Sequence, residues 1–316
     1  MKKKILAISL ALLLICSLIL SGCGGKNTLK MATGGTTGTY YAFSGTVSQV
    51  LSSKISNLSF DVQSTGASKA NIFLVADKEA DIAIVQNDVM FYANQGIDLF
   101  AGEGAITGFS AMAGCYAEVV QIVSKSDITD ISELKGKRVS VGDIGSGCEF
   151  NAHQILEAYG MTVADIDVHN LSFGDSATAL KDDKIDAFFC VAGAPTTAIV
   201  ELATSNTVNL LEVDDAHAAA LIEKYPFYTK FDIPGSSYKG INDDKQTVAV
   251  VATYIVSDDL AEDLVYKMTK ALFENADEIA QAHPKGAELD AGYSVSGISI
   301  PIHPGALKYY KEVGVR

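Results

Sequence analysis

Two glycine-rich segments carry the residues best suited to binding a small anion. The first is GGTTGTYY (Gly34 to Tyr41), and the second is GSGC (Gly145 to Cys148); an amphipathic, helix-like segment follows each of them. Backbone N–H groups at a helix N-terminus are free donors with partial positive charge, so such loops bind carboxylates and phosphates. Glycines also permit tight turns without any ligand. Their occurrence in matching positions of two similar units favours binding.

The sequence offers no comparable pattern for catalysis, cofactor binding or metal binding. It contains neither G-x-S-x-G nor H-E-x-x-H, and its five histidines share no motif. The segment GDIGSG reads G-x-x-G-x-G, which differs from the dinucleotide fingerprint G-x-G-x-x-G. After the leader the only arginines are Arg138 and Arg316, so a bidentate guanidinium clamp on a ligand is not expected. We therefore expect a binding protein that is not an enzyme and needs no cofactor or metal.

The N-terminal segment predicts export. Lys2 to Lys4 precede an apolar run of 16 residues, Ile5 to Leu20, which is shorter than the roughly 20 residues of a membrane-spanning helix. Leu20-Ser21-Gly22-Cys23 resembles a bacterial lipobox. We expect residues 1–22 to be a lipoprotein signal peptide, Cys23 to be acylated and residues 23–27 to be a tether, which places the protein outside the cytoplasm on the cell membrane.

Charge and cysteine content limit the partners. Removal of the leader leaves 21 basic and 38 acidic residues, a net charge of −17, which repels nucleic acid and anionic lipid head groups. Cys16 leaves with the leader, so Cys115, Cys148 and Cys190 remain beside the acylation site. This odd number predicts no disulfide framework. The sequence leaves undecided whether Cys148 and Cys190 form a disulfide bond with each other.

The elements that position the two loops form two similar α/β arrays. Each array has a strand, a glycine-rich loop and a helix, and later a buried strand that ends in a polar loop. In open α/β sheets ligands bind beyond the carboxyl ends of the strands, so two facing arrays make a cleft. Ser146 and Glu149 predict a capping box. The expected strands are 28–32, 60–63, 80–86, 137–142, 168–173 and 184–193, and the expected helices are 40–52, 67–77, 148–159 and 175–181.

Two long apolar segments, Glu118 to Ser126 and Thr247 to Asp258, predict a two-stranded connection between the arrays. Such a connection acts as a hinge. Ser257 is expected to cap a helix from Asp258 to about Ala276. We therefore expect one lobe from residues 28–117 and 254–316 and a second lobe from residues 118–253.

The motifs together resemble the TAXI family, the extracytoplasmic solute-binding components of TRAP transporters. The similarity rests on GGTTGTYYAFSG, on the segment from Ser64 to Val89, on the segment from Glu118 to Gly160 and on KIDAFFCVAGAPT, and it includes IPGSSYKG. It implies a two-lobed type II periplasmic-binding-protein fold with a ligand cleft between the lobes. It also implies a monomer that delivers a small carboxylate, such as the amino acids glutamate or glutamine, to an ion-gradient-driven membrane permease.

The resemblance also implies which residues bind the ligand. Many relatives carry a hydroxyl residue where this chain has Cys148, and a thiol is a weaker donor. The ammonium group of an amino acid needs an acceptor; Gln86, Asp88, Glu118 and the carbonyl of Ala192 remain open for this role. The implied ligand-binding residues are Gly35, Thr36, Gly38, Thr39, Tyr40, Thr65, Gln86, Asp88, Gly145, Ser146, Gly147, Cys148, Ala192, Gly193, Ala194, Pro195 and Tyr238.

Three other functions remain as alternatives. A receptor of an ABC-type importer has a similar two-lobed shape, and a sensory module that signals to a membrane kinase is a second possibility. An exported enzyme is the alternative from a different class. A neighbouring permease or ATPase gene distinguishes the two kinds of transporter, and turnover of a ligand by the pure protein identifies an enzyme.

Overall fold

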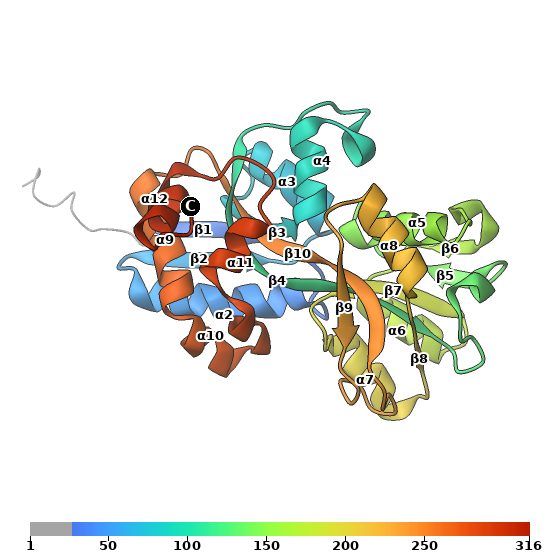
Figure 1. The fold of residues 1–316 in the computed structure, drawn as a ribbon. Helices are drawn as coiled ribbons and strands as arrows, with labels where there is room; N and C mark the ends of the chain where they lie inside the picture. Colours follow the sequence, from blue (N-terminus) through green and yellow to red (C-terminus); the bar gives the residue numbers. More distant parts are fainter. Residues whose placement is uncertain (1–26) are drawn as a thin grey trace, which may run out of the picture.

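The computed structural model describes residues 27–316, and Figure 1 shows how their helices and strands are arranged. The expected signal peptide, the acylation site Cys23 and all but the last residue of the tether lie outside the described residues. Within residues 27–316 no helix combines the length and the apolar character needed to cross a membrane.

Ten strands form one sheet, whose main path is β2-β1-β3-β10-β4-β7-β5-β6, with β8 attached to β4 and β9 to β10. Strands β2-β1-β3 are parallel to one another, as are β7-β5-β6. Every pair that includes β4 or β10 is antiparallel. The bounds are β1 Asn27–Ala32, β2 Leu58–Gln63, β3 Ile82–Gln86, β4 Phe109–Ser124, β5 Arg138–Ser140, β6 Asp167–His169, β7 Ala187–Ala192, β8 Asn209–Leu211, β9 Thr229–Ile233 and β10 Lys245–Ser257.

The long strands β4 and β10 run through both halves of the molecule (Figure 1). At one end, residues Ala252 to Val256 of β10 pair with β3. At the other end, residues Val119 to Ser124 of β4 pair with β7, and Lys245 to Ala249 of β10 pair with β9. The two expected connecting strands are therefore present and paired, although β4 begins earlier than predicted, at Phe109.

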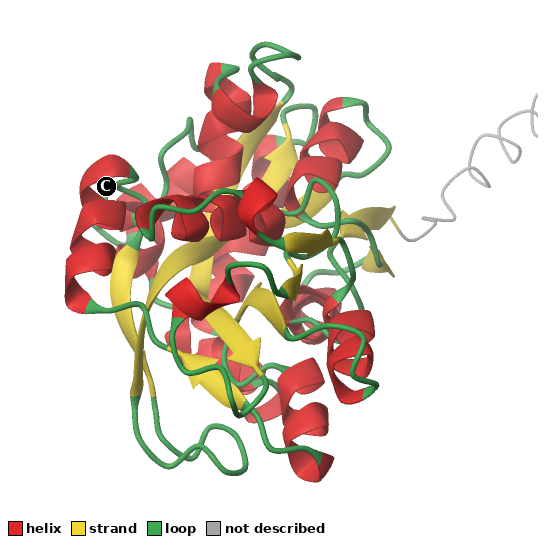
Figure 2. Cartoon of the chain, turned by 90° about the vertical axis from the view of Figure 1, so that its right-hand side faces the viewer, coloured by secondary structure: helices red, strands yellow, loops and turns green. Residues whose placement is uncertain are grey.

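Helices cover both faces of each half of the sheet (Figure 2). In the first half, alternate residues of β3 contact two different apolar clusters: Ile82 and Ile84 lie on one face, Ala83 and Val85 on the other. The first face packs against α2 Thr39–Lys54, α9 Glu262–Glu274, α10 Ala276–Ala282 and α12 Pro304–Glu312, and the second against α3 Ser68–Ala76 and α4 Asn87–Gln95.

The second half has the same layered construction. Phe189 of β7 contacts the cluster of one face, and Phe188 contacts that of the other, as the alternation of side chains along a strand requires. The first face packs against α5 Gly147–Ala158 and α8 Asp215–Lys224, and the second against α6 Phe173–Lys181 and α7 Thr197–Ser205. The remaining helices are α11 Ala291–Ser296 and the short 3-10 helices η2 Asp98–Phe100, η3 Ile131–Leu134, η4 Val163–Asp165 and η5 Pro284–Glu288.

The helix expected from Asp258 begins four residues later, at Glu262, and Ser257 is not its cap. The backbone N–H of Ser257 donates to Asp81 O at 2.9 Å, and that of Asp258 donates to Gly108 O at 3.1 Å. These hydrogen bonds hold both residues beside the sheet, so the chain cannot turn into a helix there. Pairing to neighbouring segments therefore overrides the local capping signal.

The start of α5 has the predicted Ser146 cap but lacks the second hydrogen bond of the predicted capping box. Ser146 Oγ accepts from the backbone N–H of Glu149 at 3.1 Å, as a cap should. The carboxylate of Glu149, however, accepts from the N–H of Gly145 at 2.6 Å and not from that of Ser146. Gly145 has a φ of +75°, which favours glycine, so the loop can turn sharply into the helix.

Candidate functional site

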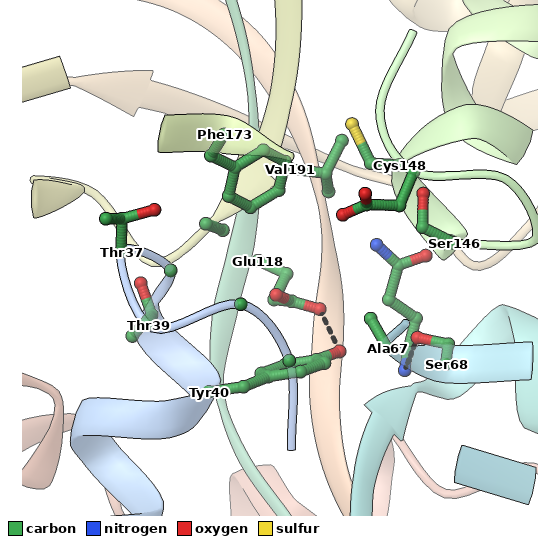
Figure 3. Close-up of a pocket in the computed structure, with 17 residues that line it drawn as sticks. Thr37, Thr39, Tyr40, Ala67, Ser68, Glu118, Ser146, Cys148, Phe173 and Val191 are labelled. Atoms are coloured by element: carbon green, nitrogen blue, oxygen red, sulfur yellow. Dashed lines mark hydrogen bonds between the residues drawn. The ribbon is translucent and has the colours of Figure 1, made fainter. Parts of the chain in front are cut away.

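A pocket lies where the loops of the two halves face one another, at the carboxyl ends of the parallel strands (Figure 3). The space between its lining atoms, open solvent at the mouth included, is about 510 Å³. Its seventeen lining residues are Gly34, Gly35, Thr37, Gly38, Thr39, Tyr40, Ala67, Ser68, Gln86, Glu118, Asp143, Ser146, Gly147, Cys148, Phe173, Val191 and Ala192.

The loops after β1, β2 and β3 form one wall, which we call the first wall. The loop after β1 leads into α2, a helix of 16 residues whose N-cap is Gly38 and which no side chain caps. Thr39 and Tyr40, the first two residues of α2, line the pocket. The uncapped amide end of a long helix therefore faces the pocket, as the glycine-rich sequence predicts.

Ala67, the N-cap of α3, brings a second helix start to the first wall. Its backbone has a φ of +65° and a ψ of −145°, and no side chain caps α3. An L-residue rarely adopts this conformation, and such residues cluster at functional sites. The next residue, Ser68, uses its Oγ to accept from the backbone N–H of Gln86 at 3.2 Å, which ties α3 to the end of β3.

The loops after β5, β6 and β7 form the opposite wall, the second wall. Ser146, Gly147 and Cys148 present the start of α5, and Val191 lies near the end of β7. Phe173, the first residue of α6, adds an aromatic ring to this wall (Figure 3). The second wall therefore offers one helix N-terminus beside several apolar side chains.

Glu118 of β4 contributes a carboxylate to the pocket (Figure 3). Only 2% of its surface is exposed, and the hydroxyl of Tyr40 donates to its Oε2 at 2.5 Å. Burial raises the pKa of Glu118 to about 8, although the hydrogen bonds from Tyr40 and Gln86 and the charge of Lys285 act in the opposite direction. A proton therefore occupies this carboxyl at neutral pH.

The walls contact each other on one side of the pocket through Thr39. Its Oγ1 donates to the carbonyl oxygen of Gly193, which follows β7, at 3.0 Å. A Cβ added at Gly193 would lie 3.0 Å from Thr39 Cγ2 and 2.6 Å from Lys285 Cε. A side chain at position 193 would therefore displace the end of Lys285 and press on Thr39.

A second set of contacts joins the walls on the side of α4 and α5. Asn151 of α5 donates from Nδ2 to Asp88 Oδ2 of α4 at 3.0 Å. The ring of Tyr92 contacts that of Phe150, with centroids 5.1 Å apart. Together with Thr39 and Gly193, these contacts hold the two walls together around the pocket.

Nine of the residues expected to bind ligand line the pocket, and eight do not. Thr36 is exposed on the outside of the first loop, and Pro195 is exposed beyond β7. Gly145 precedes the lining segment of α5, and Gly193 and Ala194 follow the lining residue Ala192.

Three polar residues from the predicted set are absent from the lining because they hydrogen-bond within the protein. Thr65 Oγ1 donates to Thr33 O at 2.8 Å and bonds Asn71 Oδ1 at 2.6 Å. Asp88 accepts from Val89 N at 2.9 Å as well as from Asn151. Tyr238 donates to the side chain of Gln121 and accepts from Thr196 N at 2.8 Å. These three side chains stabilise the walls and do not reach the pocket.

Eight lining residues lie outside that expected set. Gly34 and Thr37 belong to the first glycine-rich segment, and Glu118 is one of the acceptors considered for an ammonium group. The other five were not anticipated from the sequence: Ala67, Ser68, Asp143, Phe173 and Val191. Asp143 lies in the GDIGSG loop, and its position between a strand end and a helix start is a signal that could have identified it. Phe173 is expected at the end of a strand over 168–173, but β6 ends at His169 and α6 begins at Phe173. Val191 reads as a core residue of a strand. Nothing local marks Ala67, whose position depends on an unusual backbone conformation.

The cysteine pairing left open by the sequence is not formed. Cys115, Cys148 and Cys190 are free thiols in the structure. Cys148 lines the pocket and is 3% exposed, and burial raises the pKa of its thiol. It therefore presents a neutral thiol to the pocket.

The charges of the lining indicate which groups the pocket can hold. Among the lining residues none is Lys or Arg, whereas Glu118 and Asp143 are acids. Burial, reinforced by the charge of Asp175, raises the pKa of Asp143 as well. An anionic group must therefore bind to backbone amides and hydroxyls, and a cationic group has carboxylates available.

Three solved structures have folds similar to that of this chain. One, described as a periplasmic transporter, is 14% identical with a TM-score of 0.56, covering 90% of this chain and 92% of that chain. Another is the alkanesulfonate-binding protein SsuA from Xanthomonas axonopodis pv. citri, bound to MOPS. It is 13% identical with a TM-score of 0.53, and the match covers 91% of this chain and 84% of that chain. The third is the substrate-binding protein of an amino acid ABC transporter. It is 12% identical with a TM-score of 0.50, and the match covers 83% of this chain and 100% of that chain.

These neighbours are type II periplasmic binding proteins, and this chain has the same fold, as expected from its sequence. The sheet order, the two paired long strands and the pocket between two α/β halves are the features of that fold observed here. The model of the NMT1-like family matches residues 31–314, nearly all of the described chain, and the chain therefore belongs to the NMT1-like family.

Proposed function

We propose that this protein is an extracytoplasmic solute-binding protein that captures a small carboxylate, in particular an amino acid such as glutamate or glutamine. The observation that carries the proposal is the position of two helix starts, those of α2 and α5, on opposite walls of one pocket. Their amides and the hydroxyl of Ser146 suit a carboxylate, since helix N-termini favour negative charge.

Two lobes that close on the ligand are part of this proposal. Residues 28–117 with 254–316 form one lobe and residues 118–253 form the other, with β4 and β10 as the hinge. A ligand that contacts both walls binds the closed state more tightly than the open state. It favours closure only by this difference in binding free energy. The hydrogen bond between Thr39 and Gly193 supports this view because it joins the two walls beside the pocket.

Delivery to a TRAP-type permease driven by an ion gradient is the transport route that we propose. It rests on the resemblance of the sequence motifs to the TAXI family. A receptor for an ABC-type importer is the second candidate, since one structural neighbour is the binding protein of an amino acid ABC transporter. Uptake of the bound solute by membrane vesicles separates the two: TRAP transport needs an ion gradient, and ABC transport needs ATP.

Ligand identification tests the binding function itself. Native mass spectrometry of freshly purified protein should detect a bound small molecule. The proteinogenic amino acids and common 2-oxo and dicarboxylic acids should then be screened by thermal unfolding. A ligand at about a thousand times its Kd adds about 4 kcal/mol to the free energy of unfolding, which shifts Tm by several degrees. A panel without any shift would argue against the proposed ligand class.

A further inference from the structure

Glu118 is a buried carboxyl group in a pocket that lacks basic side chains. It is 2% exposed, and no ion pair formed among residues 27–316 includes it. The nearby basic group, Lys285, already donates from Nζ to Glu288 Oε1 at 2.6 Å. A buried carboxylate without a cation is unfavourable, so the site favours either a proton on Glu118 or a cationic ligand group next to it.

The other possible acceptors for an ammonium group are less suitable. Asp88 lies outside the lining, and its two oxygens accept from Val89 and Asn151. The carbonyl of Ala192 already accepts from Gln121 Nε2 at 3.3 Å. Gln86 has a buried Oε1 without a hydrogen-bond partner, but it is a neutral amide and this atom faces Gly147. Of the four, Glu118 alone is both charged when ionised and part of the lining.

The amide-rich helix starts lie on the same pocket as Glu118, which suits a ligand with both charges. Tyr40 links the two features, because it belongs to the first turn of α2 and its hydroxyl donates to Glu118 Oε2. A carboxylate has about four lone-pair sites, so Glu118 can accept from a ligand group in addition to Tyr40 and Gln86. A zwitterion with its carboxylate at a helix start and its ammonium at Glu118 therefore matches the charges of the pocket.

We infer that Glu118 is the counter-ion of the ligand's ammonium group, so that the pocket selects an α-amino acid over the same carboxylate without its amino group. This inference rests on the proposed binding function and makes it more specific. The other titratable groups that face or influence Glu118 are Tyr40 from α2, Asp88 from α4, Tyr116 from β4, Cys148 from α5, Cys190 from β7 and Lys285 from η5.

The inference also predicts that binding depends on pH. Glu118 holds a proton below its pKa of about 8, and it must lose that proton to pair with an ammonium group. Binding should release a proton below this pH, and affinity should rise by up to about tenfold per pH unit as the pH approaches 8. A ligand without an amino group gains nothing from ionised Glu118, so its affinity should not rise in this way.

Matched ligands and variants of the mature chain test the inference. L-glutamine is compared with glutaramic acid and L-glutamate with glutaric acid, and every other amino acid that binds is compared with its analogue lacking the amino group. Calorimetric titration between pH 6 and 8 measures Kd and proton release. Wild type should prefer the amino acid by roughly ten- to a hundredfold. Glu118→Gln should remove both the preference and the pH dependence, whereas the exposed Glu223→Gln should retain both.

The possible outcomes separate this inference from the proposed function. If the analogues bind as tightly as the amino acids and Glu118→Gln changes nothing, Glu118 is not the counter-ion, although the protein still binds carboxylates. If no compound of either series binds, both proposals are wrong. A preference for the amino acid that survives in a folded Glu118→Gln protein would assign the ammonium to another acceptor and overturn the inference.

Discussion

Gly147 at the start of α5 lies directly against the side-chain amide of Gln86 at the end of β3. A Cβ added at Gly147 would stand 2.0 Å from Gln86 Oε1 and 2.9 Å from Nε2. These residues belong to opposite walls of the pocket, so their contact belongs to the closed arrangement that we propose. The absence of a side chain at position 147 thus allows the walls to meet.

Gly147→Ala should hinder closure without preventing folding. The φ angle of Gly147 is not in the left-handed region, so the helix tolerates alanine at this position. The added methyl group, however, collides with the side chain of Gln86 when the walls meet. Overpacking of this kind costs about 1–3 kcal/mol, which corresponds to a loss of affinity of roughly fivefold to somewhat over a hundredfold. Calorimetric titration measures the loss, and small-angle scattering should show less contraction with ligand than in wild type.

Gly45→Ala is the matched control for that variant. Gly45 lies within α2, and nothing comes within 4 Å of a Cβ added there. This change should leave affinity unchanged and stabilise the helix by about 0.5–1 kcal/mol. If Gly147→Ala binds ligand as tightly as the control and contracts equally, the contact with Gln86 does not limit closure.

Thr39→Val should weaken ligand binding by removing the hydrogen bond to Gly193. Valine keeps the shape of threonine but lacks the hydroxyl, whereas Thr39→Ser keeps the hydroxyl. Comparing the two variants therefore measures the contribution of the hydrogen bond to Gly193. Because Thr196 Oγ1 also donates to Gly193 O at 3.0 Å, the loss should be near 1 kcal/mol, or about fivefold in Kd. Equal Kd values for the two variants would show that the bond contributes nothing to closure.

The stability of the ligand-free protein should fall as pH rises towards 8, owing to Glu118. Its folded-state pKa of about 8 exceeds the ordinary 4.5, so between these values the folded state holds a proton that the unfolded state has lost. Stability attributable to this group then decreases by at most about 1.4 kcal/mol per pH unit. Urea unfolding of wild type and Glu118→Gln measures the difference.

The window for that comparison is pH 6.5 to 8. Burial also raises the pKa of Asp88, to about 6, so its contribution changes mainly at lower pH. Wild type should lose stability relative to Glu118→Gln across the window. A constant difference between the two proteins would mean that Glu118 is already ionised at pH 6.5.

Cys148 should report on the opening of the pocket. It lines the pocket at 3% exposure, whereas Cys115 and Cys190 are fully buried elsewhere. In a chain that begins at Gly24, a thiol reagent should label Cys148 first, and a bound ligand should slow the reaction. Peptide mass spectrometry identifies the labelled residue. Labelling of Cys115 or Cys190 at the same rate, or no protection by ligand, would contradict the prediction.

Cys23 should carry lipid in native membranes. The reason is the Leu20-Ser21-Gly22-Cys23 sequence after a short apolar leader. Mass spectrometry of the N-terminal peptide should detect acyl chains, and Cys23→Ser should release the protein from the membrane, because a surface with this net negative charge has no electrostatic attraction to anionic lipids. An unmodified N-terminus at another residue would disprove lipid anchoring.

The sequence alone was sufficient to predict the two α/β arrays, the long connecting strands and both glycine-rich loops of the pocket. Those features depend on local signals: runs of apolar residues for buried strands, helical spacing for amphipathic helices and glycine at turns. Gly38, Thr39 and Tyr40, together with Ser146, Gly147 and Cys148, line the pocket because the carboxyl ends of parallel strands bring such loops together.

The tertiary structure alone decided which polar residues face the pocket and which support it. Asp88, Thr65 and Tyr238 resemble binding residues in the sequence, yet their hydrogen bonds to distant segments hold them away from the pocket. Glu118 sits within a long apolar strand whose sequence does not show which side chains reach the pocket. Whether a side chain of β4 reaches the pocket depends on how β4 pairs with β10 and β7 and on how closely the two walls meet. The local pattern of apolar residues predicts neither of these.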